Sequence, residues 1–180
     1  MTPSGEVLHH LGAADASVRV VEFGDFECPY CAGAAPVLRE LVEGSQGRVR
    51  LVFRNFPLFE VHPHALTAAL AAESAAASGG NDVFWKMHDE LFAHQARLTD
   101  ADLRTYAAAV GADPELAAGG PAQRFAPVVQ ADYAAGLAAG VSATPTLFID
   151  GQPYDGRVQV ADLRRATGLD APRARSRSLR

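Results

Sequence analysis

The side chains in this sequence that are best suited to covalent chemistry are two cysteines, three positions apart. The 180-residue chain has no other cysteine, and Cys28 and Cys31 both belong to one Cys-Pro-Tyr-Cys motif. Such a pair is typical of a redox dithiol, half of a zinc site or a haem attachment. A bridge between them would close a very short loop and would constrain the unfolded chain little. The motif therefore indicates disulfide exchange rather than a structural disulfide.

The two metal-based interpretations of the motif are disfavoured by its surroundings. Haem attachment requires a histidine directly after the second cysteine, where this chain has Ala32. A zinc site would need histidines to complete it, and His62 and His64 are the candidates. These two flank a proline before an Ala-rich segment, which favours capping or packing, with modulation of the dithiol and metal binding as alternatives. We therefore expect a redox dithiol with no metal and no cofactor.

The elements around the motif place it at the junction of a strand and a helix. Residues 18–23 are rich in β-branched side chains and predict a buried strand. Pro29 suits the first position of a helix, because its missing N–H has no partner to lose there. The N-terminus of that helix would stabilise a thiolate on Cys28. We expect Cys28 to be the exposed nucleophile and Cys31 the shielded resolving thiol.

The rest of the sequence predicts an α/β layout with a helical block in its middle. A second strand after the first helix makes a βαβ unit, and an Asp-Gly turn joins the two last strands. The further elements expected are strands at 49–54 and 146–149, a weak strand from Tyr154 to Gly156, and helices at 65–77 (ended by Gly79 and Gly80), 83–91, 103–110, from Asp113 to Gly119, 127–140 and 160–167.

Two motifs more than a hundred residues apart resemble the DsbA-like family of the thioredoxin superfamily. They are Phe23–Cys31 (FGDFECPYC) and Gly140–Gly151 (GVSATPTLFIDG). The likeness continues through 53–57, 62–64 and 84–85, and it spans roughly 11–167. The resemblance implies a thioredoxin-like α/β fold with an inserted all-helical subdomain.

This layout divides the chain into a split core and an insertion. The first half of the core (βαβ) is expected at 11–58, and the helical insertion at 59–139. The second half of the core (ββα) is expected at 140–168. Residues 1–10 and 171–180 are expected to be flexible termini.

The resemblance implies roles for three residues outside the motif. Pro145 matches the family's cis-proline, which faces the dithiol, and the backbone of Thr144 before it can pair with an extended substrate chain. Glu22 matches a buried acid below the dithiol, which could accept the proton of Cys31. Without the resemblance, Glu22 would be interpreted as an outward-facing strand residue.

The two residues between the cysteines are expected to contact substrate and to tune the redox potential. Pro29 and Tyr30 occupy these positions, and Tyr30 would either offer a surface to substrate or cover the sulfurs. The most oxidising relatives carry a histidine where Tyr30 stands. Tyr30 supplies no positive charge, and Asp25 and Glu27 lie just upstream. Both effects should raise the pKa of Cys28 relative to those enzymes and weaken it as an oxidant.

The function expected from the sequence is thiol–disulfide exchange with protein or peptide substrates, as oxidase, reductase or isomerase. Cys28 would form the mixed disulfide and Cys31 would resolve it. A glutathione-linked reductase is an alternative, because Cys-Pro-Tyr-Cys also looks like a glutaredoxin active site. A further alternative is a non-catalytic redox-sensing or peptide-binding module, even one that regulates a transporter, since some relatives are fused to antiporters.

Charge and hydropathy restrict the partners and the location. The net charge is −5, and four of the 16 basic residues are arginines within the last ten positions, so the body of the chain is more acidic still. An acidic body disfavours nucleic acid as a partner. No apolar stretch approaches the ~20 residues of a membrane span. Residues 1–6 lack the features of a signal peptide. We expect a cytoplasmic protein, or a periplasmic or extracytoplasmic one if an export signal has been removed.

The dipeptide between the cysteines yields a prediction on redox potential. Equilibration of the dithiol with glutathione buffers should give a potential more reducing than about −120 mV, the value of the strongest periplasmic oxidant. A potential at that value would contradict the expected influence of Tyr30, Asp25 and Glu27.

Overall fold

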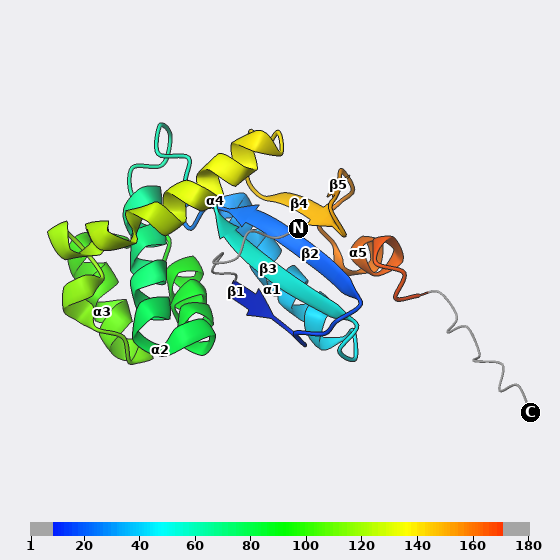
Figure 1. Cartoon of the computed structure of the whole chain (residues 1–180), viewed down its shortest axis with the longest axis horizontal. Helices are drawn as coiled ribbons and strands as arrows, with labels where there is room; N and C mark the ends of the chain where they lie inside the picture. Colours follow the sequence, from blue (N-terminus) through cyan, green and yellow to red (C-terminus); the bar gives the residue numbers. More distant parts are fainter. Residues whose placement is uncertain (1–8, 171–180) are drawn as a thin grey trace, which may run out of the picture.

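A five-stranded mixed sheet organises the part of the chain that the computed structural model describes, residues 9–170. The strand order is β1-β3-β2-β4-β5 (Figure 1). β2 and β3 are parallel, as the predicted βαβ unit requires, and every other pair is antiparallel. The strands are β1 His9–Leu11, β2 Val18–Gly24, β3 Val49–Asn55, β4 Thr146–Ile149 and β5 Gln152–Tyr154.

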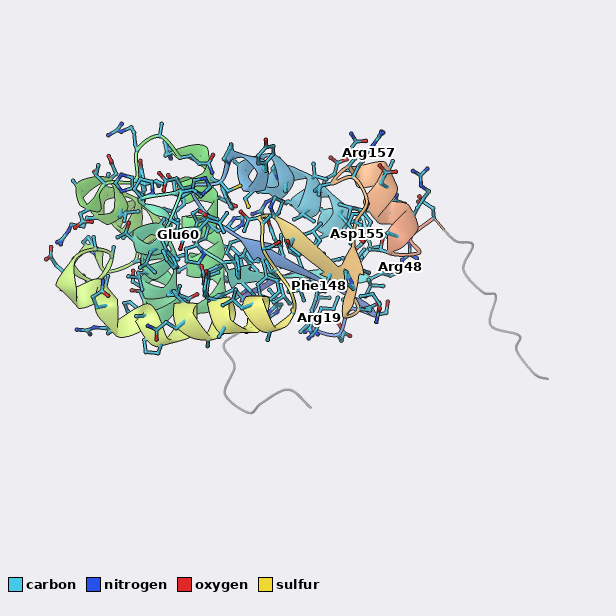
Figure 2. All side chains as sticks on the ribbon, turned by 90° about the horizontal axis from the view of Figure 1, so that it is seen from above. Arg19, Arg48, Glu60, Phe148, Asp155 and Arg157 are labelled. Atoms are coloured by element: carbon cyan, nitrogen blue, oxygen red, sulfur yellow. The ribbon has the colours of Figure 1, made fainter. Side chains whose placement is uncertain are left out.

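Helices cover both faces of this sheet, and the α/β class with a helical insertion is confirmed. Figures 1 and 2 show α4 on one face and α1 with α5 on the other, while α2 and α3 lie beside the sheet. The helices are α1 Pro29–Glu43, α2 Ala65–Ala93, α3 Asp100–Val110, α4 Ala126–Ala138 and α5 Val160–Ala166, with short 3₁₀ helices at η1 Pro114–Leu116 and η2 Gly120–Phe125.

The long helix α2 is two helices joined at a kink. Gly79 and Gly80 have non-helical backbone angles, and Gly80 has a positive φ of 73°. That conformation favours glycine, because a side chain would crowd the backbone there. The break predicted at Gly79 and Gly80 is therefore confirmed.

The first strand, β1, corrects the expectation that residues 1–10 are flexible. His9 and His10 belong to β1, which pairs antiparallel with β3. The Asn81 side chain continues this pairing, since it accepts a hydrogen bond from the His10 N–H at 2.9 Å and donates one to the His10 carbonyl at 2.8 Å. Three residues are too few to show a periodic pattern, so this strand could not be predicted from hydrophobic periodicity.

The last strand, β5, ends at Tyr154, so the expected strand from Tyr154 to Gly156 is wrong in extent. Asp150 and Gly151 both have positive φ, the geometry of a two-residue hairpin turn. That tight turn sets Gln152 opposite the end of β4 and leaves no room for a later start. The remaining terminal residues, 1–8 and 171–180, whose flexibility was expected, lie outside the described residues.

A buried polar network joins the helical insertion to the sheet. The carboxylate of Glu73 on α2 contacts His9 Nε2 at 3.0 Å and accepts a hydrogen bond from Asn55 Nδ2 at 2.7 Å. Asp132 on α4 accepts hydrogen bonds from the Asn55 backbone N–H at 2.9 Å and from Arg54 Nε at 2.8 Å. Because buried polar groups are costly unless they are hydrogen-bonded, the network favours one placement of α2 and α4 on β3.

An aromatic residue anchors the segment that carries the dithiol. Phe26 is almost fully buried and lies between the end of β2 and the start of α1. Its ring centroid is 5.0 Å from that of Phe53 on β3 and 5.1 Å from that of Phe92 on α2. The loop before the motif is thus fixed to both the sheet and the insertion.

Helix α4 approaches the sheet closely at a glycine. A Cβ added at Gly136 would lie 2.5 Å from Phe56 Cδ2 and 3.1 Å from Phe23 Cδ1. Phe23 and Phe56 meet edge to face and are buried there. The absence of a side chain at Gly136 therefore lets α4 cover the end of β2.

This contact predicts a stability difference between two glycine variants. Gly136→Ala should lower the free energy of unfolding by roughly 1–3 kcal/mol, because the methyl group overpacks the core. Gly33→Ala on α1 is the matched control, since a Cβ there meets nothing within 4 Å. It should raise stability by roughly 0.5–1 kcal/mol through helix propensity. Urea unfolding of the reduced proteins measures both, and a Gly136→Ala protein as stable as the parent would refute the close packing.

Candidate active site

The dithiol lies at the N-terminus of α1, as the sequence predicts. Cys28 is the N-cap residue with extended backbone angles, and Pro29 holds the first helical position. Both cysteines are free thiols. Cys31 is fully buried, in agreement with its expected shielding, but Cys28 is only 3% exposed. The expectation of an exposed nucleophile is therefore wrong for this state of the protein.

The loop before β4 buries Cys28. The Cys28 thiol donates a hydrogen bond to the Thr144 carbonyl, with a distance of 3.4 Å between Sγ and O. The peptide bond between Thr144 and Pro145 is cis. The loop reaches the dithiol because β4 pairs with β2, with Thr146 opposite Phe23. Such long-range cover leaves no signal in the local sequence around the cysteines.

The two thiols are strongly unequal as acids. The pKa of Cys28 is lowered to about 5, above all by its hydrogen bond with the Cys31 thiol. Burial opposes this change, while the Thr144 side chain and the backbone N–H groups of Cys31 and Tyr30 support it. The Thr144 hydroxyl has no other hydrogen-bond partner among the described residues. It is therefore free to turn toward the sulfur when Cys28 ionises.

Cys31 holds its proton more tightly than an ordinary thiol. Its pKa is raised well above the usual range, first by the hydrogen bond with Cys28, then by burial and by the charge of Glu22. The Asp25 backbone N–H donates to Cys31 Sγ at 3.4 Å, and this hydrogen bond lowers the pKa of Cys31. The site thus combines one thiol that ionises easily with a neighbouring thiol that stays protonated.

Glu22 is a buried acid near the two thiols, not an outward-facing strand residue. Its side chain is fully buried on β2, and neither carboxyl oxygen has a hydrogen-bond partner within residues 9–170. Burial, and secondly the negative charge of Cys28, raise the pKa of Glu22 to about 8. A carboxyl with that pKa can hold or release a proton near neutral pH.

The two acidic residues before the motif are engaged by neighbouring groups. Asp25 accepts hydrogen bonds from His62 Nδ1 at 2.8 Å and from the Leu58 N–H at 2.9 Å. Glu27 accepts one from the His64 N–H at 2.6 Å. The pKa of Cys28 is lowered from its ordinary value, chiefly by the hydrogen bond with Cys31. The expected rise relative to relatives with a histidine in place of Tyr30 stays a prediction.

The histidine pair divides into two different roles. His64 holds the N-cap position of α2, but its side chain makes no capping hydrogen bond. His62 is joined to Asp25 beside the dithiol. Within residues 9–170 no group of three or more His, Cys, Asp or Glu side chains is arranged to hold a metal ion. The same residues include no helix with the length and apolarity to cross a membrane.

Tyr30 and Pro29 form the outer surface of the motif. Tyr30 is 77% exposed, so its side chain projects into solvent rather than covering the sulfurs. Pro29 is also exposed. Both side chains are available to an approaching polypeptide.

Gln95 is a further residue of the site that the sequence analysis missed. Its side-chain amide donates to the carbonyls of Phe26 and Cys28, each at 2.8 Å. The residue follows α2, and a single glutamine there carries no motif or periodicity that could have identified it. The amide fixes the backbone on both sides of Glu27 and so orients the start of α1.

Comparison with known proteins agrees with this geometry. A family model described as thioredoxin matches residues 5–167, and the chain belongs to that family. Its fold is that of the DsbA-like proteins. The oxidised crystal structure of BdbD from Bacillus subtilis has a TM-score of 0.78 at 25% identity and covers 92% of this chain and 93% of BdbD. A thioredoxin-like oxidoreductase from Silicibacter pomeroyi has a TM-score of 0.73 at 30% identity, covering 88% and 89%.

Curated relatives match the same region but are longer proteins. The Na⁺/H⁺ antiporter NhaA 1 of Salinispora arenicola is 42% identical over 156 residues, which are 86% of this chain and 23% of the antiporter. The antiporter NhaA 3 of Salinispora tropica is 43% identical with the same coverage. The chain thus spans about a quarter of the length of these relatives.

The buried acid predicts a pH-dependent stability difference. In the folded protein the pKa of Glu22 is raised from 4.5 to about 8, so its charged form is disfavoured and stability is lost as pH rises through this window. Glu22→Gln removes that loss. Its free energy of unfolding relative to the parent should therefore rise from pH 4.5 to 8, by at most about 1.4 kcal/mol per pH unit.

Unfolding titrations of the reduced proteins across this range measure the difference. Cys28, whose lowered pKa acts in the opposite direction, contributes to both curves, so the result is expressed as the difference between the variant and the parent. Glu40→Gln, an exposed position on α1, is the matched control and should run parallel to the parent. A parallel curve for Glu22→Gln as well would show that the acid is not perturbed.

Proposed function

We propose that this chain is a thiol–disulfide oxidoreductase that exchanges disulfides with protein or peptide substrates through Cys28. The observation that carries the proposal is the placement of two adjacent free thiols at the N-terminus of α1, with Cys28 Sγ 3.4 Å from the Thr144 carbonyl. The pKa of Cys28 is lowered to about 5, while that of Cys31 is raised. Exchange requires one cysteine to be a thiolate, because the thiolate is the nucleophile. The other cysteine stays protonated until it resolves the mixed disulfide.

Reduction of a substrate would proceed in two displacements. The Cys28 thiolate attacks one sulfur of the substrate disulfide, forms a mixed disulfide and releases the other sulfur as a thiolate. Cys31 then loses its proton, attacks Cys28 Sγ and releases the second substrate thiolate. The substrate disulfide is reduced and the dithiol becomes a disulfide. Oxidation of a substrate dithiol is the same sequence reversed.

Glu22 is the proposed acceptor of the Cys31 proton. Its carboxyl oxygens have no other partner among the described residues, and its charge and that of Cys31 influence one another. A pKa of about 8 lets the acid take up a proton in one step and return it in the reverse step. The buried position keeps this exchange away from bulk water.

The proposed substrate surface surrounds Cys28. Thr144 and Pro145 lie on one side, where an extended chain could add to the Thr144 backbone by strand-like pairing. Pro29 and Tyr30 provide the exposed part. Because the Cys28 sulfur bonds the Thr144 carbonyl in the free protein, a substrate would have to displace this contact to reach the sulfur.

A second candidate function is a redox module of a larger membrane protein. The observation that favours it is the set of curated relatives, which are named Na⁺/H⁺ antiporters and contain this domain as about a quarter of their length. In that case the dithiol would bind or modify transporter segments rather than serve free substrates. The cytoplasmic and the extracytoplasmic location both stay predictions.

Single-cysteine variants test the exchange reaction. In an insulin-reduction or scrambled-ribonuclease assay, Cys28→Ser should lose all turnover, whereas Cys31→Ser should accumulate mixed disulfides that a reductant releases. Ala32→Ser, next to the motif, is the matched control and should stay active. Retained activity in Cys28→Ser would disprove the mechanism. Activity only in the presence of glutathione would favour the glutaredoxin-like alternative.

The module hypothesis predicts different behaviour of Cys31→Ser. A binding module should retain its partner under reducing, non-denaturing conditions, because no disulfide is needed. A covalent exchange enzyme should release it.

A further inference from the structure

His62 is held beside the dithiol by a buried carboxylate. His62 Nδ1 lies 2.8 Å from Asp25 Oδ2, and Asp25 is fully buried while the His62 side chain is 21% exposed. The carboxylate is itself fixed, because it accepts hydrogen bonds from the Leu58 N–H at 2.9 Å and the Glu27 N–H at 2.8 Å. Asp25 therefore acts as a rigid support that sets the position of the imidazole.

The backbone of Asp25 is bonded to both cysteines. Its carbonyl accepts a hydrogen bond from the Cys28 N–H at 3.1 Å, and its N–H donates to Cys31 Sγ at 3.4 Å. Asp25 therefore contacts His62 through its side chain and both cysteines through its backbone. The loop that carries His62 is also held near Asp25. The His62 N–H donates to the Leu58 carbonyl at 2.9 Å, and the Leu58 N–H donates to the Asp25 carboxylate.

The charges around His62 favour its protonated form. Burial acts to lower the pKa of His62, but the Asp25 hydrogen bond and the negative charges of Asp25, Cys28 and Glu27 raise it above its ordinary value. Asp25, Glu27 and Cys28 all come from the segment between β2 and α1. The neighbouring titratable groups on its own loop are Glu60 and His64.

The Cys-Pro-Tyr-Cys motif supplies no positive charge of its own to the Cys28 thiolate. We propose that His62, oriented by Asp25, provides this charge from outside the motif and stabilises the reduced dithiol. This inference rests on the proposed exchange function of Cys28. His62 is here a positioning residue, because it acts through the charge on Cys28 and need not touch the substrate.

The proposal has a redox consequence. The thiolate exists only in the reduced protein, and disulfide formation removes its negative charge. His62 should then bind its proton less tightly, so oxidation of the dithiol is coupled to partial proton release from the imidazole. Because a stabilised reduced form makes a stronger oxidant, a charged His62 makes the dithiol more oxidising.

The first test measures ionisation of Cys28 without any substrate. The ultraviolet absorbance of the thiolate is titrated in the reduced parent, in His62→Gln and in the matched control His64→Gln. At the midpoint pH of the parent, His62→Gln should show a ratio of thiolate to thiol that is about two- to fivefold lower, and His64→Gln should match the parent. An unchanged Cys28 titration in a folded His62→Gln protein would overturn the proposal.

The second test needs no variant and so does not depend on the folding of one. The ring proton resonances of His62 are titrated by NMR in the reduced and the oxidised parent. The midpoint should be lower in the oxidised protein, with no such difference at His64. Equal midpoints at His62 in the two states would overturn the coupling. Both tests can succeed or fail whatever the insulin assay gives, so failure of this inference is separable from failure of the proposed function.

Discussion

The hydrogen bond between the two sulfurs of the motif is the interaction on which the rest of the site depends. It makes Cys28 the easier thiol to ionise and Cys31 the harder one. The pair keeps this relation only while the start of α1 is fixed, and contacts with other parts of the chain fix it. Phe26 is packed into the core just before the motif, and Gln95 holds the backbone on both sides of Glu27. The acidities of the two cysteines therefore depend on contacts with residues that are distant from the motif in the sequence.

Features with strong local signals could be predicted from the sequence. Proline after Cys28 and the apolar run before Gly24 located the strand and the helix that carry the dithiol. The resemblance to DsbA-like proteins placed Glu22 and Pro145 near it. Contacts between distant segments could not be predicted. The burial of Cys28 depends on the Thr144 carbonyl, and the environment of Asp25 depends on a histidine 37 residues away. Residue types alone do not indicate such partners, and nothing near Asp25 in the sequence points to its contact with His62.

The helical insertion is joined to the core by polar as well as apolar contacts. Glu73 on α2 and Asp132 on α4 meet at Asn55, so that one strand residue contacts both helices. Hydrogen-bonded polar groups in a core add directional requirements that apolar packing lacks. The insertion can therefore be held in one orientation over β3. The loop that precedes α2 and contains His62 is held with it. Strand β3 contributes to both regions, since Phe53 packs against Phe26 just before the dithiol and Asn55 belongs to the polar network.

The side chain of Gln95 has a consequence for how this fold can be divided. The thioredoxin core and the helical insertion look like separable modules, since one is inserted between the halves of the other. Yet the amide that fixes the carbonyls of Phe26 and Cys28 belongs to the insertion. The core alone would leave the Phe26 carbonyl without this donor and the Cys28 carbonyl with the Ala32 N–H alone, at 3.2 Å. A foreign insertion would have to bring its own donor to the same place. In this protein the two parts are therefore one structural unit, and the geometry of the dithiol depends on residues outside the Cys-Pro-Tyr-Cys sequence.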